Sequence, residues 1–147
     1  MNSRQSFRMF IRDQLGQPYR WSGDAPGGWD CSGLVLAGLR HVGYKLPDMT
    51  SAQLAAKFTD KAIKDVTDEG QLVFYHLGIK RGVTHVMVVY RFWDEGQFIL
   101  AGARGGDRDT TTVDIAWKKK AFVDLVHGDY CKTRRVLIVD PFKDGAP

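Results

Sequence analysis

The chain has 147 residues, 44% of them hydrophobic and 26% charged, a composition typical of one globular domain covering residues 1–147. No run of about 18 apolar residues occurs, so the sequence excludes a membrane span. The net charge of +4 suits a polyanionic partner. Because the basic residues are dispersed rather than interleaved with aromatic ones, the sequence does not predict nucleic-acid binding.

Three helices are predicted in the first half of the chain, where apolar residues recur at helical spacing. Ser3 suits the N-cap of the first helix and Asp30 that of the second. A loop dense in glycine and proline, 16–28, separates these two helices. The predicted helices cover residues 3–15, 31–42 and 51–58.

The second half of the chain changes to the alternating pattern of β-strands. A helical segment at 115–122 interrupts it. Helices followed by a mostly antiparallel sheet predict an α+β domain. The predicted strands cover residues 71–76, 84–92, 97–101, 110–114 and 135–139.

The stretch around Cys31 carries the strongest functional signal. This cysteine follows the pair Trp29-Asp30 and opens an apolar helical run. A thiol at a helix N-terminus lies beside unpaired N–H groups and the positive end of the helix dipole, which favour the thiolate. Because a thiolate is the nucleophile of cysteine catalysis, this position predicts covalent chemistry.

A nucleophilic thiol needs a base, and the chain has four histidines. His41 lies about three helical turns after Cys31, too far to reach the thiol. His76 ends a strand before a turn and His127 lies in a polar turn, which favours surface positions. His85 begins the most hydrophobic strand, where its ring can face a cleft while the rest of the strand is buried. It is therefore the predicted base.

The sequence also argues against a disulfide framework, a metal site and a secretion signal. Cys31 and Cys131 are the only cysteines, too few for a disulfide framework, and a bridge between them would block the nucleophile. No cluster of His, Cys, Asp and Glu has metal-ligand spacing, so the sequence predicts neither a metal nor a cofactor. The N-terminal residues lack the apolar core of a secretion signal, so none is expected.

Five sequence blocks occur in a fixed order: PYRWSG, GGWDCSGLV, LPDMTSAQ, DEGQLVFY and THVMVVY. Together they resemble the NlpC/p60-type, papain-like cysteine peptidases of bacterial cell walls. The resemblance implies a papain-like fold in which the helix with the nucleophile packs on the sheet. It also implies hydrolysis of an amide bond in peptidoglycan stem peptides, by analogy the bond between D-Glu and the diamino acid, without a cofactor.

The resemblance also implies the roles of individual residues. Cys31 matches the family's nucleophile and His85 its general base. Tyr19 matches a tyrosine that helps to hold the oxyanion. The residues that the resemblance places along the site are Tyr19, Trp21, Asp30 and Ser32.

One position departs from the family pattern in a way that affects the chemistry. The family places a polar residue on the strand after the base, where it orients the imidazole, and the alignment puts Leu100 there. Leucine cannot accept the second imidazole N–H. Either a backbone carbonyl, a water or one of Gln97, Asp107 and Asp109 takes that role, or the activity is weak.

The C-terminal third, with AGARGGDRDTTT and RRVLIVDPF, more loosely resembles family members encoded with bacteriophage tail genes. This implies a protein carried on a virion tail, or one that stays cytoplasmic until it is delivered to the cell wall. Phage tail proteins, or a secretion machine and an immunity protein, would then be its partners.

Three alternatives to a wall peptidase stay open. The same Cys/His chemistry also serves an acyltransferase, and an injected antibacterial wall amidase would have the same sequence features. A structural tail-tip or wall-binding module with weak or no activity is the third, and Leu100 favours it.

Overall fold

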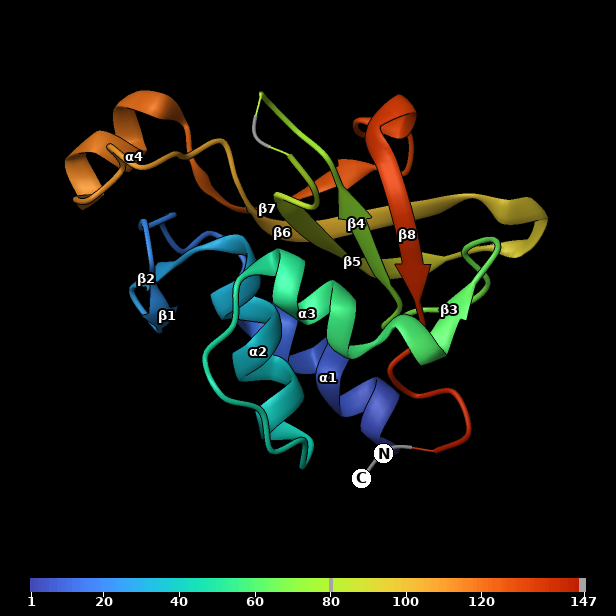
Figure 1. Ribbon diagram of the computed structural model, residues 1–147. Coiled ribbons are helices and arrows are strands. Elements are labelled where there is room, and N and C mark those ends of the chain that lie inside the picture. The colour runs from blue at the N-terminus through green and yellow to red at the C-terminus, as the bar shows by residue number, and fades with distance from the viewer. Residues whose placement is uncertain (80, 146–147) are drawn as a thin grey trace.

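The computed structural model describes residues 1–79 and 81–145, in which a layer of helices covers one face of a six-stranded sheet (Figure 1). The predicted α+β class, with helices before a mostly antiparallel sheet, is confirmed. No helix in this described part is long and apolar enough to cross a membrane.

Three helices near the N-terminus form the helical layer: α1 (Ser3–Asp13), α2 (Cys31–His41) and α3 (Ser51–Lys57). Each begins at a side chain that accepts a backbone N–H of the first turn, which leaves one fewer unpaired donor there. These caps are Asn2, Asp30 and Thr50. The cap of the first helix is therefore one residue earlier than the predicted Ser3.

The sheet follows in the sequence, and its strands lie in the order β3-β8-β4-β5-β6-β7, each antiparallel to its neighbours. The strands are β3 (Ala62–Ile63), β4 (Leu72–Tyr75), β5 (His85–Phe92), β6 (Phe98–Arg104), β7 (Phe122–His127) and β8 (Arg135–Val139). Short 3-10 turns are η1 (Thr59–Lys61), η2 (Asp94–Gly96) and η3 (Lys132–Arg134). Inside the predicted 16–28 loop, β1 (Asp24–Ala25) and β2 (Gly28–Trp29) form a small hairpin.

Two segments differ from the prediction. Residues 110–114 form no strand, because the Thr112 hydroxyl accepts the Ile115 N–H and starts helix α4 (Val113–Lys119). The predicted helix at 115–122 ends earlier, at Lys120, whose left-handed backbone stops it. Phe122 then opens β7, which the sequence did not predict.

The alternation of side chains along the strands divides the sheet into two faces. The helix face packs against α1, α2 and α3 and comprises Leu72, Phe74, Val86, Val88, Ala101 and Ala103. The back face forms a second apolar cluster that comprises Val66, Val73, Tyr75, Met87, Val89 and Leu100. Any residue of β5 therefore belongs to one face or the other according to its place in this alternation.

A buried carboxylate ties the two ends of the chain together. Asp140 Oδ2 accepts hydrogen bonds from Arg4 Nη2 and Gln71 Nε2, each at 3.0 Å, and Oδ1 accepts the Phe142 N–H at 2.9 Å. Burial acts to raise the pKa of Asp140, but the hydrogen bonds from Arg4 and Gln71 outweigh it and lower this pKa. The carboxylate thus links α1, β4 and the end of β8.

We expect Asp140→Asn to lower the free energy of unfolding by about 1–3 kcal/mol at pH 7, because Arg4 loses its charged partner. Since the pKa of Asp140 is lowered by folding, this contribution is present above the unfolded pKa and is lost as pH falls through the folded pKa. Urea unfolding at pH 7 and at acid pH measures the difference. The exposed Asp13→Asn is the control; an equal loss in both variants would contradict this role.

Candidate active site

The capping of α2 fixes the position of Cys31, its first residue. Asp30 Oδ1 accepts the Gly33 N–H at 2.6 Å and the Ser32 hydroxyl at 3.4 Å. Both bonds hold the first turn of the helix in place. The thiol of Cys31 therefore lies at the helix N-terminus, as the sequence predicted.

The loop before α2 packs directly on that first turn. A Cβ added to Gly33 would lie 2.1 Å from the carbonyl oxygen of Gly23, so only glycine allows this approach. Trp29 is almost fully buried, and its indole N–H donates to Gln17 Oε1 at 2.9 Å. This packing makes the loop one wall of a cleft above Cys31.

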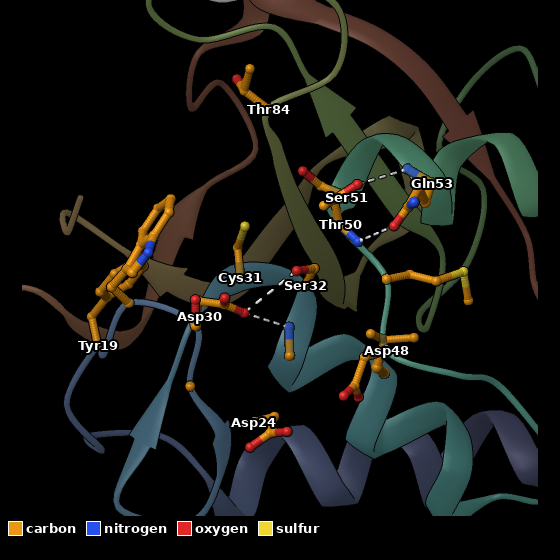
Figure 2. A pocket seen from close by; sticks show the side chains of 16 residues that line it. Tyr19, Asp24, Asp30, Cys31, Ser32, Asp48, Thr50, Ser51, Gln53 and Thr84 are labelled. Carbon is orange, nitrogen blue, oxygen red and sulfur yellow. Dashed lines mark hydrogen bonds between the residues drawn. The ribbon is translucent and has the colours of Figure 1, made fainter. Parts of the chain in front are cut away.

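The cleft has a volume of about 430 Å³, and its floor is the start of α2. Figure 2 shows the Cys31 thiol between Tyr19 on one side and the start of α3, Thr50 and Ser51, on the other. Thr84, the residue before β5, also lines it. The structure thus brings the predicted residues Cys31, Tyr19, Trp21, Asp30 and Ser32 together around one cleft.

The cleft is acidic although the chain carries a net charge of +4. Its lining includes Asp24, Asp30 and Asp48, and among the described residues no Lys, Arg or His lines it. Asp48 is paired with Arg40 at 3.0 Å. The carboxylates of Asp24 and Asp30 thus give the cleft a negative potential that attracts a positively charged ligand group.

The thiol of Cys31 is not activated in this arrangement. Burial, and next the Asp30 carboxylate, raise the pKa of Cys31 to about 11, although the backbone N–H groups of Val86 and Ser32 act to lower it. The thiol is therefore neutral near pH 7, contrary to the expectation from the helix N-terminus. Burial and the neighbouring Cys31 also raise the pKa of Tyr19, so its hydroxyl stays protonated and able to donate.

The structure does not bring the predicted base to Cys31. His85 is paired across the sheet with Tyr75, and its ring packs on Tyr75 and Tyr130 on the back face, with centroids 5.7 and 5.9 Å away. Its Nε2 lies 3.4 Å from the Tyr130 hydroxyl. Burial, and next the charge of Arg104, lower the pKa of His85 to about 4. The predicted Cys31–His85 pair is absent here.

Leu100, which the alignment places at the third catalytic position, does not lie opposite His85 in this structure. Leu100 is paired with Val89, four residues further along β5 than His85, and is fully buried in the back-face cluster. The residue whose charge reaches His85 is Arg104, at the end of β6. The alternatives Asp107 and Asp109 lie beyond β6, where Asp107 pairs with Lys119.

Sequence reasoning missed several residues of the site. The sequence does carry a signal for Thr50 and Ser51. The pattern Thr-x-x-Gln is typical of the start of a helix, so it predicts that the loop before it ends in an ordered position, here beside the cleft. The sequence carries no such signal for Thr84 and Tyr130, because their roles depend on the face of the sheet on which each side chain lies. In the described residues no group of three or more His, Cys, Asp or Glu side chains could hold a metal ion.

The profile of the NlpC/P60 family matches residues 16–127, which is most of the chain and includes the whole cleft floor. The chain belongs to the NlpC/P60 family. It is 42% identical over 73 residues to a probable endopeptidase of Mycobacterium tuberculosis, a match covering 47% of this chain and 19% of that protein. The chain thus spans about a fifth of the length of this relative.

Solved structures share the papain-like α+β fold. The NlpC/p60 domain of the peptidoglycan hydrolase SagA superposes with a TM-score of 0.61 at 21% identity, covering 95% of this chain and 99% of that one. RipD of Mycobacterium tuberculosis, described as a non-catalytic NlpC/p60 protein adapted to peptidoglycan binding, gives a TM-score of 0.58 at 17% identity, covering 95% and 97%. This NlpC/P60 chain therefore resembles both hydrolytic and non-catalytic domains.

We expect the alkylation rate of Cys31 by iodoacetamide to rise about tenfold per pH unit from pH 7 to 10 and to level off only near pH 11, because the thiolate reacts. Asp30→Asn keeps a capping oxygen but removes the negative charge, so it lowers the thiol pKa and raises the rate at pH 8. Mass spectrometry separates Cys31 from Cys131. A plateau below pH 8 in the unmodified chain would contradict a neutral thiol.

Proposed function

We propose that this domain hydrolyses an amide bond in peptidoglycan stem peptides, with Cys31 as the nucleophile. The observation that carries the proposal is the position of Cys31 as the first residue of α2, on the floor of an open cleft. Membership of a family that includes peptidoglycan hydrolases supports the substrate class. The bond between D-Glu and the diamino acid is the proposed point of cleavage.

The lining of the cleft suits such a peptide. The carboxylates of Asp24 and Asp30 attract an ammonium group, which stem peptides carry on their diamino acid. Trp21 keeps 40% of its surface exposed beside the cleft, and the Arg108 guanidinium lies over its ring, 5.9 Å from the centroid. The hydroxyls of Thr50 and Ser51 provide further polar contacts on the opposite wall.

In the proposed reaction, the Cys31 sulfur attacks the scissile carbonyl carbon and forms a thioester as the amine leaves. The Tyr19 hydroxyl and the backbone N–H of Cys31 stabilise the oxyanion. Water then releases the acid and restores the thiol. His85 is the proposed acceptor of the thiol proton and its donor to the leaving amine, which requires its ring to reach the cleft.

A second candidate function is peptide binding without hydrolysis. The placement of His85 on the back face favours it, because in the described part of the chain no histidine lines the cleft around Cys31. The neutral thiol would then be one more contact for the bound peptide. Delivery by a phage tail or a secretion machine, and acyl transfer to an amine or alcohol, stay predictions from the sequence.

We expect the purified chain to release peptides from peptidoglycan and muropeptides, and Cys31→Ala to reduce this release more than about a thousandfold, because no nucleophile is left. Mass spectrometry of the products identifies the bond. Cys131→Ser, which leaves the cleft unchanged, is the matched control and keeps the activity. Release by Cys31→Ala at the rate of the unmodified chain would contradict the nucleophilic role.

Calorimetric titration with intact muropeptides separates the two candidates. Binding to Cys31→Ala together with cleavage by the unmodified chain supports the peptidase. Binding without cleavage by either protein establishes the second candidate, and absence of both would overturn the assignment of the cleft.

A further inference from the structure

His85 lies on the back face of the sheet, where, among the described residues, its imidazole makes only part of the hydrogen bonds that it could make. Its Nε2 lies 3.4 Å from the Tyr130 hydroxyl, near the outer limit for a hydrogen bond. The Tyr75 ring packs on His85, with centroids 5.7 Å apart, and the buried Tyr75 hydroxyl lies beside the Arg135 guanidinium, whose charge acts to lower the pKa of Tyr75. The long contact to Tyr130 is therefore a weak hydrogen bond, and the packing of the two tyrosine rings is what else holds His85 here.

The two residues next to His85 in the sequence both lie at the cleft. Thr84 lines the cleft, and the Val86 N–H is directed at the Cys31 sulfur. Successive side chains of a strand point to opposite faces. A change of backbone conformation at Thr84 and His85 alone would therefore exchange the faces on which these two side chains lie. This turn would bring the imidazole to the cleft and leave the rest of β5 in its register.

Thr84 opposes this turn with its own hydrogen bonds. Its hydroxyl accepts the Leu77 N–H at 2.8 Å and donates to the Leu77 carbonyl at 3.0 Å. Its backbone N–H donates to the Tyr75 carbonyl at 2.9 Å, which closes the ladder between β4 and β5 at this end. The side chain of Thr84 thus fastens the start of β5 to the end of β4.

We propose that Thr84 and Tyr130 are positioning residues that hold His85 behind the sheet, and that the reactive state forms when residues 84 and 85 turn over and His85 replaces Thr84 in the lining of the cleft that holds Cys31. This inference rests on the proposed peptidase function, because it gives His85 a task at Cys31. The structure then represents the resting state of the site. In the turned state the imidazole accepts the Cys31 proton, giving a thiolate and an imidazolium with no other atoms exchanged.

Disulfide trapping tests the turn without any substrate. In a Cys131→Ser background, the thiol introduced by His85→Cys has Cys31 as its only possible partner, and oxidised glutathione drives the bond. We expect a disulfide between Cys31 and the new thiol at position 85. It should form faster with Thr84→Val, which lacks the hydroxyl, and at the original rate with Thr84→Ser, which keeps it. Peptide mapping identifies the bond.

Met87→Cys is the matched control, because residue 87 lies on the same back face but two residues further into β5. We expect it to form no bond with Cys31. Failure of the thiol at position 85 to bridge to Cys31 in the folded protein, with or without Thr84→Val, would overturn the proposal. Equal bridging by Met87→Cys would also overturn it, since the bond would then reflect general opening of the sheet.

A second measurement avoids new cysteines. We expect Thr84→Val to raise the alkylation rate of Cys31 at pH 7 roughly tenfold, since an imidazole beside the thiol that lowers its pKa by one unit gives ten times more thiolate. Adding His85→Ala should abolish the increase, and Thr84→Ser should not show it. An increase that persists in the double variant would overturn the role of His85.

Peptidoglycan digestion keeps this proposal distinguishable from the proposed function. In one outcome, the thiol at position 85 forms a disulfide with Cys31 but the unmodified chain digests no peptidoglycan. This result would refute the peptidase function and establish the turn of residues 84 and 85. In the opposite outcome, the unmodified chain digests peptidoglycan but neither the disulfide nor the increase in alkylation rate is observed. This result would refute the turn and establish the peptidase function.

Discussion

The packing of β5 on α2 is the constraint on which the site depends. Val86 and Val88 are fully buried against the helices, and burial of each side chain contributes about 1.5–3 kcal/mol. A shift of the strand by one residue would move both to the back face and Met87 to the helix face, so both apolar clusters would have to repack. The register of β5 is therefore fixed, and His85, which precedes Val86, lies on the back face. The same packing directs the Val86 N–H at Cys31.

The cleft itself depends on a second close contact, between the loop before α2 and the first turn of that helix. Gly33 lets the Gly23 carbonyl approach, Asp30 caps the helix, and Trp29 anchors the loop through Gln17. These contacts place Cys31 at a helix N-terminus, yet the Asp30 carboxylate and burial keep its thiol neutral. Burial, the larger of these two effects, thus outweighs the backbone N–H groups that act to lower the pKa of Cys31 in this arrangement.

The sequence allowed the fold class, three helices and the place of Cys31 at a helix N-terminus to be predicted, because each has a local signal: a cap, a helical period or a specific motif. No such local signal shows on which face of the sheet His85 lies. A motif gives the identity of a residue, but it does not show to which face the first side chain of a strand points when a loop precedes that strand. The sequence likewise carries no signal for the cross-strand partner of Leu100, which is Val89. Residues 110–114 carry three threonines that favour a strand, but the Thr112 cap outweighs this preference.

The most direct test of this account is the titration of the His85 ring by NMR in the unmodified chain. Since burial and Arg104 lower its pKa to about 4, we expect the ring to stay neutral down to about pH 4. Its signals should shift in Tyr130→Phe and stay unchanged in Cys31→Ala, because it contacts the tyrosine and not the thiol. A ring that titrates at or above pH 6.5, with a pKa that falls when Cys31 is replaced, would show a Cys31–His85 pair in the resting protein and contradict the account.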